Sequence, residues 1–117
     1  MTTGELQTRT KQFALRIIRL SQALPRSAEA RVIGNQILRS GTSVGANYRA
    51  ACRSKSRADF IAKLGTVVEE IDETQFWLDL LADSKLVPEA RLKDLRGEAG
   101  ELAAIFTASR ATAKSHA

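Results

Sequence analysis

The side chains with the clearest chemical potential in this sequence are arginines, and their spacing predicts phosphate binding. On one predicted helix, four of them fall within about 80° of one another at about 100° per residue. Planar guanidinium groups on a rigid helix suit a phosphate backbone and need not read its base sequence. Two further cations follow directly, so the predicted basic surface consists of Arg31, Arg39, Arg49, Arg53, Lys55 and Arg57. Tyr48 lies near its edge, where it would stack on a base.

The charge of the chain is divided unevenly along its length. Residues 1–57 carry 11 Lys and Arg against 2 Asp and Glu, whereas residues 58–117 carry 7 against 11. A basic half can hold a polyanion, and an acidic half can dock the basic half of a neighbouring copy. We therefore expect RNA or single-stranded DNA as a partner. The alternatives are arginines that pair with acids or only keep the protein soluble, and a basic surface that meets an acidic protein.

The residues that suggest enzymatic chemistry form no complete catalytic set. Glu70 and Glu73 have the three-residue spacing found in dimetal bundles, but those sites also need a Glu-x-x-His pair, and the sole histidine is His116. Cys52 has no histidine or second thiol near it in the sequence, which favours a packed small residue. We expect no enzymatic activity, no metal site and no cofactor.

Four amphipathic segments must position these side chains. Thr2, Ser27 and Ser56 are typical N-cap residues, and Pro88 suits a first helical turn. Apolar residues recur in threes and fours between these points. The predicted helices cover about residues 3–23, 27–53, 57–84 and 88–110, with a frayed tail at 111–117. Short connections predict a single all-α domain over residues 1–117, an antiparallel up-down-up-down four-helix bundle.

The helix predicted over 27–53 carries two unusual sets of residues beside its core stripe. Gly34, Gly41 and Gly45 share one sector and form a groove into which another backbone can pack, either in the same bundle or in a second subunit. The second set is polar, and we expect it to form interhelical hydrogen bonds: Ser40, Ser43 and Asn47.

The second half of the helix predicted over 57–84 is apolar nearly all round. Its acidic residues face away from the core, yet large apolar side chains share their sector or flank it. The predicted interface of a homo-oligomer consists of Phe76, Trp77, Leu80 and Leu81. The alternative is a loop or tail of the same chain that folds over Phe76 and Trp77.

The sequence also predicts where the protein resides. The start Met-Thr-Thr-Gly-Glu lacks the pattern of a secretory signal, and Cys52 is the only cysteine. No apolar run approaches the roughly 20 residues of a membrane span. We expect a cytoplasmic protein that has no membrane partner.

Several of these residues also form three motifs: Arg39-Ser40-x-x-Ser43-Val44-x-x-Asn47, Ser56-x-x-Asp59-Phe60-Ile61-x-Lys63-Leu64, and Glu73 ahead of Trp77-Leu78. With these motifs the chain resembles a known family, the four-helix-bundle proteins encoded in intervening sequences of bacterial 23S ribosomal RNA genes. Here Asn47-Tyr48-Arg49-Ala50-Ala51 replaces the common Asn-Ile-Ala-Glu-Gly, so the family's carboxylate is missing at Ala50. The resemblance implies structural roles for Ser40, Ser43, Asn47, Phe60 and Glu73.

This resemblance extends to a related branch, the accessory variability proteins of diversity-generating retroelements. These proteins assemble as barrel-shaped pentamers and bind nucleic acid and a reverse transcriptase. The resemblance therefore implies a homopentamer. It also supplies an alternative function, that of a protein-interaction scaffold or adaptor for a neighbouring enzyme such as a reverse transcriptase, without contact to nucleic acid.

Overall fold

The computed structural model describes residues 1–116, which form four helices and no strand. The helices are α1 (Thr3–Gln22), α2 (Ala28–Ala51), α3 (Arg57–Asp83) and α4 (Glu89–Ser115). The hydroxyls of Thr2, Ser27 and Ser56 each accept a hydrogen bond of 3.1 Å from the backbone N–H three residues later. These three helices therefore begin at the caps that the sequence predicts.

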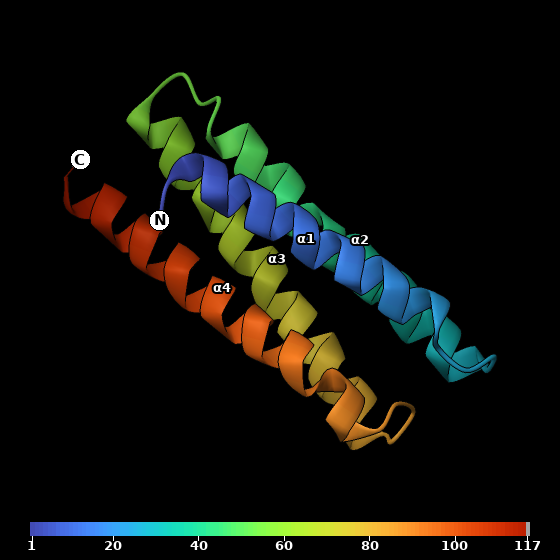
Figure 1. Cartoon of the computed structure of the whole chain (residues 1–117). Coiled ribbons are helices and arrows are strands. Elements are labelled where there is room, and N and C mark those ends of the chain that lie inside the picture. The colour runs from blue at the N-terminus through green and yellow to red at the C-terminus, as the bar shows by residue number, and fades with distance from the viewer. Residues whose placement is uncertain (117) are drawn as a thin grey trace.

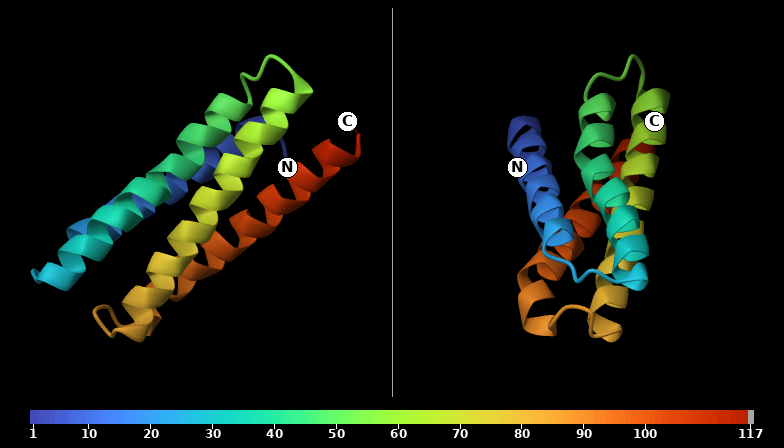
Figure 2. Two further views of the ribbon diagram at one scale, coloured as in Figure 1. Left: turned by 180° about the vertical axis from the view of Figure 1, so that it is seen from behind. Right: turned by 90° about the vertical axis from the view of Figure 1, so that its right-hand side faces the viewer.

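The helices run alternately up and down along a body of 46 × 20 × 20 Å (Figure 1). Both termini and the connection from α2 to α3 lie at one end, and the other two connections lie at the opposite end (Figures 1 and 2). The predicted all-α, antiparallel four-helix bundle is confirmed. Neighbours in the chain pack most closely, while α1 and α4 meet along a sparser seam.

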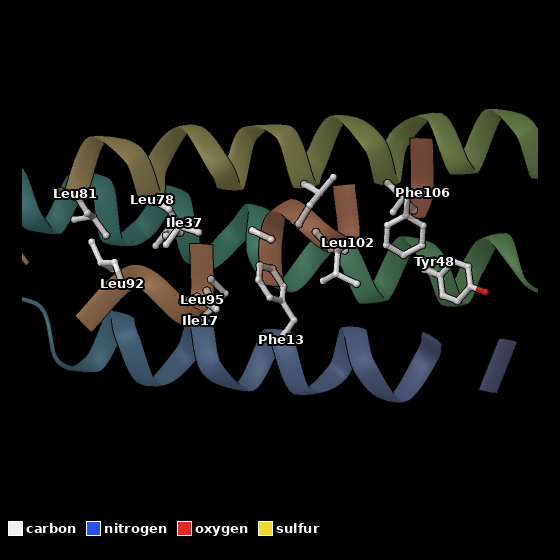
Figure 3. Packing of buried hydrophobic residues seen from close by; sticks show 14 of the residues in the cluster. Phe13, Ile17, Ile37, Tyr48, Leu78, Leu81, Leu92, Leu95, Leu102 and Phe106 are labelled. Atoms are coloured by element: carbon white, nitrogen blue, oxygen red, sulfur yellow. The ribbon is translucent and has the colours of Figure 1, made fainter. Parts of the chain in front are cut away.

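The core is a single apolar column to which every helix contributes (Figure 3). Phe13 and Ile17 of α1 lie beside Leu102 and Leu95 of α4 in this view, and the same cluster includes Ile37 of α2 and Leu78 of α3. Tyr48, which was expected to stack on a base, is only 7% exposed and packs on Phe106 with ring centroids 5.2 Å apart. That expectation is wrong because Tyr48 lies on the core side of α2.

Helix α4 is longer than the sequence predicts, since it continues through residues 111–115, where a frayed tail was expected. Alanines favour helix in this segment. Arg57, at the start of α3, also donates a hydrogen bond of 3.3 Å from Nη1 to the carbonyl of Ala113. The last turns therefore lie against α3, and of the predicted tail only Ala117 falls outside the described residues.

The glycine groove of α2 receives α1 of the same chain. A Cβ added at Gly41 would lie 2.7 Å from Cγ1 of the fully buried Ile17, and one at Gly45 would lie 3.2 Å from Oγ1 of Thr10. At Gly34 it would lie 2.9 Å from Cδ1 of Leu24. The prediction of close packing within the bundle is confirmed: Gly41 and Gly45 let α1 approach α2, and Gly34 makes room for Leu24 of the connection between them.

Replacement of Gly41 by alanine should destabilise the protein. The clash with Ile17 outweighs the gain in helix propensity, so we expect a net loss of about 1–2 kcal/mol in the free energy of unfolding, measured with urea. Gly97→Ala is the matched control, because nothing lies within 4 Å of its added Cβ. It should stabilise α4 by about 0.5–1 kcal/mol. Equal stabilisation by both substitutions would contradict the packing account.

Candidate nucleic-acid interface

Five of the six residues of the predicted basic surface are exposed cations without a salt bridge to any described residue: Arg31, Arg49, Arg53, Lys55 and Arg57. Arg49 and Arg53 lie one turn apart near the C-terminal end of α2, and Lys55 follows in the connection to α3. Arg31 lies at the other end of α2. The structure therefore concentrates positive charge around the connection from α2 to α3.

Arg39 is the exception, because it forms salt bridges within the subunit. Its Nη2 donates to Oε2 of Glu73, and its Nη1 lies 3.7 Å from Oε2 of Glu70. At about 100° per residue, Arg39 lies at the edge of the arginine sector that faces α3. The acidic flank of α3 therefore neutralises it within one subunit, as the alternative of paired arginines expected.

The family-motif residues around Arg39 stabilise the contact between α2 and α3. Glu73 also accepts a hydrogen bond of 3.3 Å from Nε1 of Trp77. The buried Ser40 accepts one of 2.9 Å from Thr74, which confirms an interhelical bond at that position. Ser43 and Asn47 behave differently from the prediction.

The hydroxyl of Ser43 donates to the carbonyl of Arg39 at 2.6 Å, and Nδ2 of Asn47 donates to the carbonyl of Ser43 at 2.8 Å. Both bonds stay within α2. The predicted interhelical bonds are wrong here because short polar side chains reach the carbonyl one turn back on their own helix.

A groove between α1 and α2 brings a further cation to the basic surface. Lys11 of α1 and Arg49 of α2 line this groove of about 450 Å³ together with Gln7, Thr8 and Thr42. We call it the α1–α2 groove. Lys11 was not predicted as part of this surface because it belongs to another helix. Gly45 is the sequence feature that indicates the groove, since its missing side chain lets α1 approach α2 beside Arg49.

The side chain of Arg57 lies at the other flank of this end of the bundle, between α3 and α4. It lines a largely apolar hollow of about 640 Å³ with the half-buried Phe60 and with residues of the last turns of α4, including His116. Phe60 packs against the core from this side. Its structural role is thus to join the start of α3 to α4.

The predicted oligomer surface is divided by the structure. Phe76 is 56% exposed, and its ring meets Trp77 edge-on with centroids 4.9 Å apart. Leu80 is half-buried, whereas Leu81 is 0% exposed and points into the core near Leu92 (Figure 3). Leu81 is therefore wrong as an interface residue, because it lies one turn after Leu78 and continues the core stripe of α3.

Exposed carboxylates surround Phe76 on the outer face of α3. Glu69, Asp72 and Asp83 are exposed and form no salt bridge with a described residue, while Asp79 accepts from Nη2 of Arg96 at 2.9 Å. The patch is thus an aromatic centre with an acidic rim. Its charge is opposite to that of the α1–α2 groove.

The described residues 1–116 contain neither a membrane-spanning helix nor a candidate metal site. None of the helices is long and apolar enough to cross a membrane. No three His, Cys, Asp or Glu side chains in this part of the chain gather closely enough to hold a metal ion.

Comparison with known proteins decides the family. The family model described as 23S rRNA-intervening sequence protein matches residues 4–108. The chain belongs to this family. A protein with a solved structure is similar along nearly its whole length: a protein of unknown function from the S23 ribosomal protein family of Bacteroides thetaiotaomicron VPI-5482. It is 34% identical, with a TM-score of 0.86 over 94% of this chain and 98% of the other. No curated protein matches.

This family member contains one carboxyl group whose pKa depends on the contact between α2 and α3. Burial raises the pKa of Glu70, against the opposing attraction of Arg39, while Glu73 and Glu69 raise it further. A carboxyl group with a raised pKa costs the folded state stability when it ionises. This cost is absent at pH values below 4.5, the pKa of this carboxyl group in the unfolded chain, and complete at pH values above its folded pKa.

Glu70→Gln should therefore raise the free energy of unfolding more, or lower it less, at pH 7 than at pH 4. Urea unfolding at both pH values measures this difference. Asp72→Asn is the control, since Asp72 is exposed, forms no salt bridge with a described residue and is not among the groups that shift the pKa of Glu70. Its effect should be small and similar at both pH values. A more favourable effect of Glu70→Gln at pH 4 than at pH 7 would contradict the assignment.

Proposed function

We propose that this protein is a non-enzymatic, homo-oligomeric bundle that binds RNA or single-stranded nucleic acid through its phosphates. The observation that carries the proposal is the α1–α2 groove. Lys11 and Arg49 both line it, and neither has a salt bridge to a described residue. Arg53 and Lys55 extend the positive charge beyond the end of α2. Without carboxylate partners, these cations are available to phosphate.

The other groups of the α1–α2 groove suit the same ligand. The hydroxyl of Thr8 and the amide of Gln7 can donate hydrogen bonds to phosphate or sugar oxygens, whereas the hydroxyl of Thr42 already donates to the carbonyl of Leu38 at 2.6 Å. The only tyrosine of the chain is buried in the core, so no tyrosine platform for a base accompanies the cations. The ligand is thus held by its backbone, with little dependence on base sequence.

A homo-oligomer is the second part of the proposal, and the exposed Phe76 with its acidic rim supports it. An aromatic side chain that is 56% exposed gains free energy when a partner covers it. A second copy of this chain is the proposed occupant. The resemblance to the accessory variability proteins makes a pentamer the proposed assembly. Its proposed setting is the cytoplasm, where the free thiol of Cys52 stays reduced.

The proposal predicts how affinity for single-stranded RNA depends on salt. If Lys11, Arg49, Arg53 and Lys55 each neutralise a phosphate, the log-log slope of the association constant should be about −3. Arg49→Gln and Lys11→Gln should each weaken binding and make the slope shallower by about 0.7, measured by fluorescence anisotropy.

Arg39→Gln is the matched control, because Glu70 and Glu73 already neutralise this arginine of the same helix. It should change affinity and slope little. A salt-independent affinity, or equal losses from Arg39→Gln and Arg49→Gln, would show that the α1–α2 groove is not the binding site.

The oligomer predicts the effect of a charge placed on the aromatic patch. Phe76→Asp adds a carboxylate to an already acidic rim and should lower the mass in solution, measured by multi-angle light scattering. Thr107→Asp adds the same charge at an exposed position of α4 and should leave the mass unchanged. A wild-type protein that stays monomeric at high concentration would remove this part of the proposal.

The same patch favours a second candidate function, a scaffold or adaptor that docks a protein such as a reverse transcriptase without touching nucleic acid. Capture on the tagged protein, with and without nuclease, separates the two functions. A protein partner that survives nuclease treatment, from a bundle that carries no RNA, supports the adaptor. RNA that co-purifies and disappears with nuclease supports the nucleic-acid binder.

A further inference from the structure

The sparse seam between α1 and α4 is joined by one strong ion pair. Arg9 donates from Nε and Nη2 to the two carboxylate oxygens of Glu98 at 2.7 and 2.6 Å, and its Nη2 lies 3.5 Å from Glu101. Both side chains of the main pair are largely buried, with 25% and 16% exposed. Opposite charges therefore pair at this point of the seam between α1 and α4.

Two turns further along the same seam, the charges no longer match. The two helices are antiparallel, so a step of seven residues from Arg9 leads to Arg16, and the same step back from Glu98 leads to Arg91. Arg16 and Arg91 line one cleft of about 420 Å³. Neither forms a salt bridge with a described residue. Two cations thus line one cleft at the step of the seam that follows the pair.

The remaining lining of this cleft strengthens the positive charge and adds an apolar floor. Arg19 contributes a third guanidinium, and Asp94 is the only carboxylate, with no cation in salt-bridge range among the described residues. The floor is formed by Leu20 and Leu95, together with Ala23. We call this site the Arg16–Arg91 cleft.

We propose that the Arg16–Arg91 cleft binds a phosphate monoester whose organic part is compact and flat, the chemistry of a nucleoside monophosphate. Guanidinium groups form short, charge-assisted hydrogen bonds with phosphate oxygens, and a phosphate between Arg16 and Arg91 replaces their repulsion by attraction. The leucines provide an apolar surface for a base. The volume lies within the range of small-molecule sites.

This cleft is separate from the α1–α2 groove. It lies where α1 ends and α4 begins, at the end of the bundle that carries the α1–α2 and α3–α4 connections (Figure 1). Arg53 and Lys55 lie near the opposite end, at the connection from α2 to α3. The two sites therefore share no lining residue, and each can be tested without the other.

Calorimetric titration of the full chain with adenosine monophosphate at low salt tests the proposal, with adenosine as the ligand control. Adenosine monophosphate should bind once per chain, and adenosine should not bind measurably. Arg16→Gln and Arg91→Gln should each raise the dissociation constant about tenfold or more, the loss expected for a charge-assisted bond. Lys93→Gln removes the same charge from α4 outside the cleft and should change it little.

A thermal readout shows that the variants remain folded. Without ligand, Arg91→Gln should keep or raise the melting temperature, because it removes one of three guanidinium groups that line the cleft. Adenosine monophosphate should raise the melting temperature of the wild type but not that of this variant. A fall in melting temperature that matches the loss of binding would assign the arginine a structural role and overturn the proposal.

A second arm identifies the source of the phosphate monoester by comparing RNA with a 5′-phosphate and RNA with a 5′-hydroxyl. A preference for the phosphate that depends on Arg16 supports a terminal nucleotide as ligand, and binding of the free nucleotide alone supports a metabolite. No binding of either at millimolar concentration overturns the proposal. Equal losses from Lys93→Gln, or loss of nucleotide binding in Arg49→Gln, overturn it as well.

Discussion

The close approach of α1 to α2 is the constraint on which the rest of the structure depends. Gly41 and Gly45 leave space that Ile17 and Thr10 fill, and no larger residue fits there without displacing them. Ile17 thereby reaches the core, where it is 0% exposed. The same approach places Lys11 of α1 beside Arg49 of α2, so the glycines that allow the packing also create the α1–α2 groove.

The neighbours of α2 then decide which of its arginines are free. The flank that faces α3 meets an acidic stripe, and Arg39 is neutralised there by Glu70 and Glu73. The flank that faces α1 meets a surface rich in hydroxyl, amide and basic groups, and Arg49 stays unpaired. Two arginines on one helix thus differ in electrostatic role because different helices pack beside them. The seam of α1 with α4 repeats this contrast between Arg9, which is paired, and Arg16, which is not.

Local signals in the sequence predicted most of the fold, whereas several side-chain contacts between helices could not be read from it. Thr2, Ser27 and Ser56 set the starts of three helices because a cap acts within one turn. The end of α4 depends on a contact from Arg57, which no local pattern contains. Leu81 was assigned to the surface because α3 is apolar nearly all round, and only the position of α4 shows which apolar side is covered.

The candidate site follows the same rule, since the arginines of α2 were visible as a pattern but Lys11 belongs to a different pattern on α1.

The most direct measurement of the central claim is photo-cross-linking of single-stranded RNA that carries a photoreactive uridine analogue, followed by peptide mapping. The account predicts cross-links on the segments around Lys11 and Arg49. Cross-links confined to the acidic face of α3, or an absence of cross-links at low salt, would contradict it.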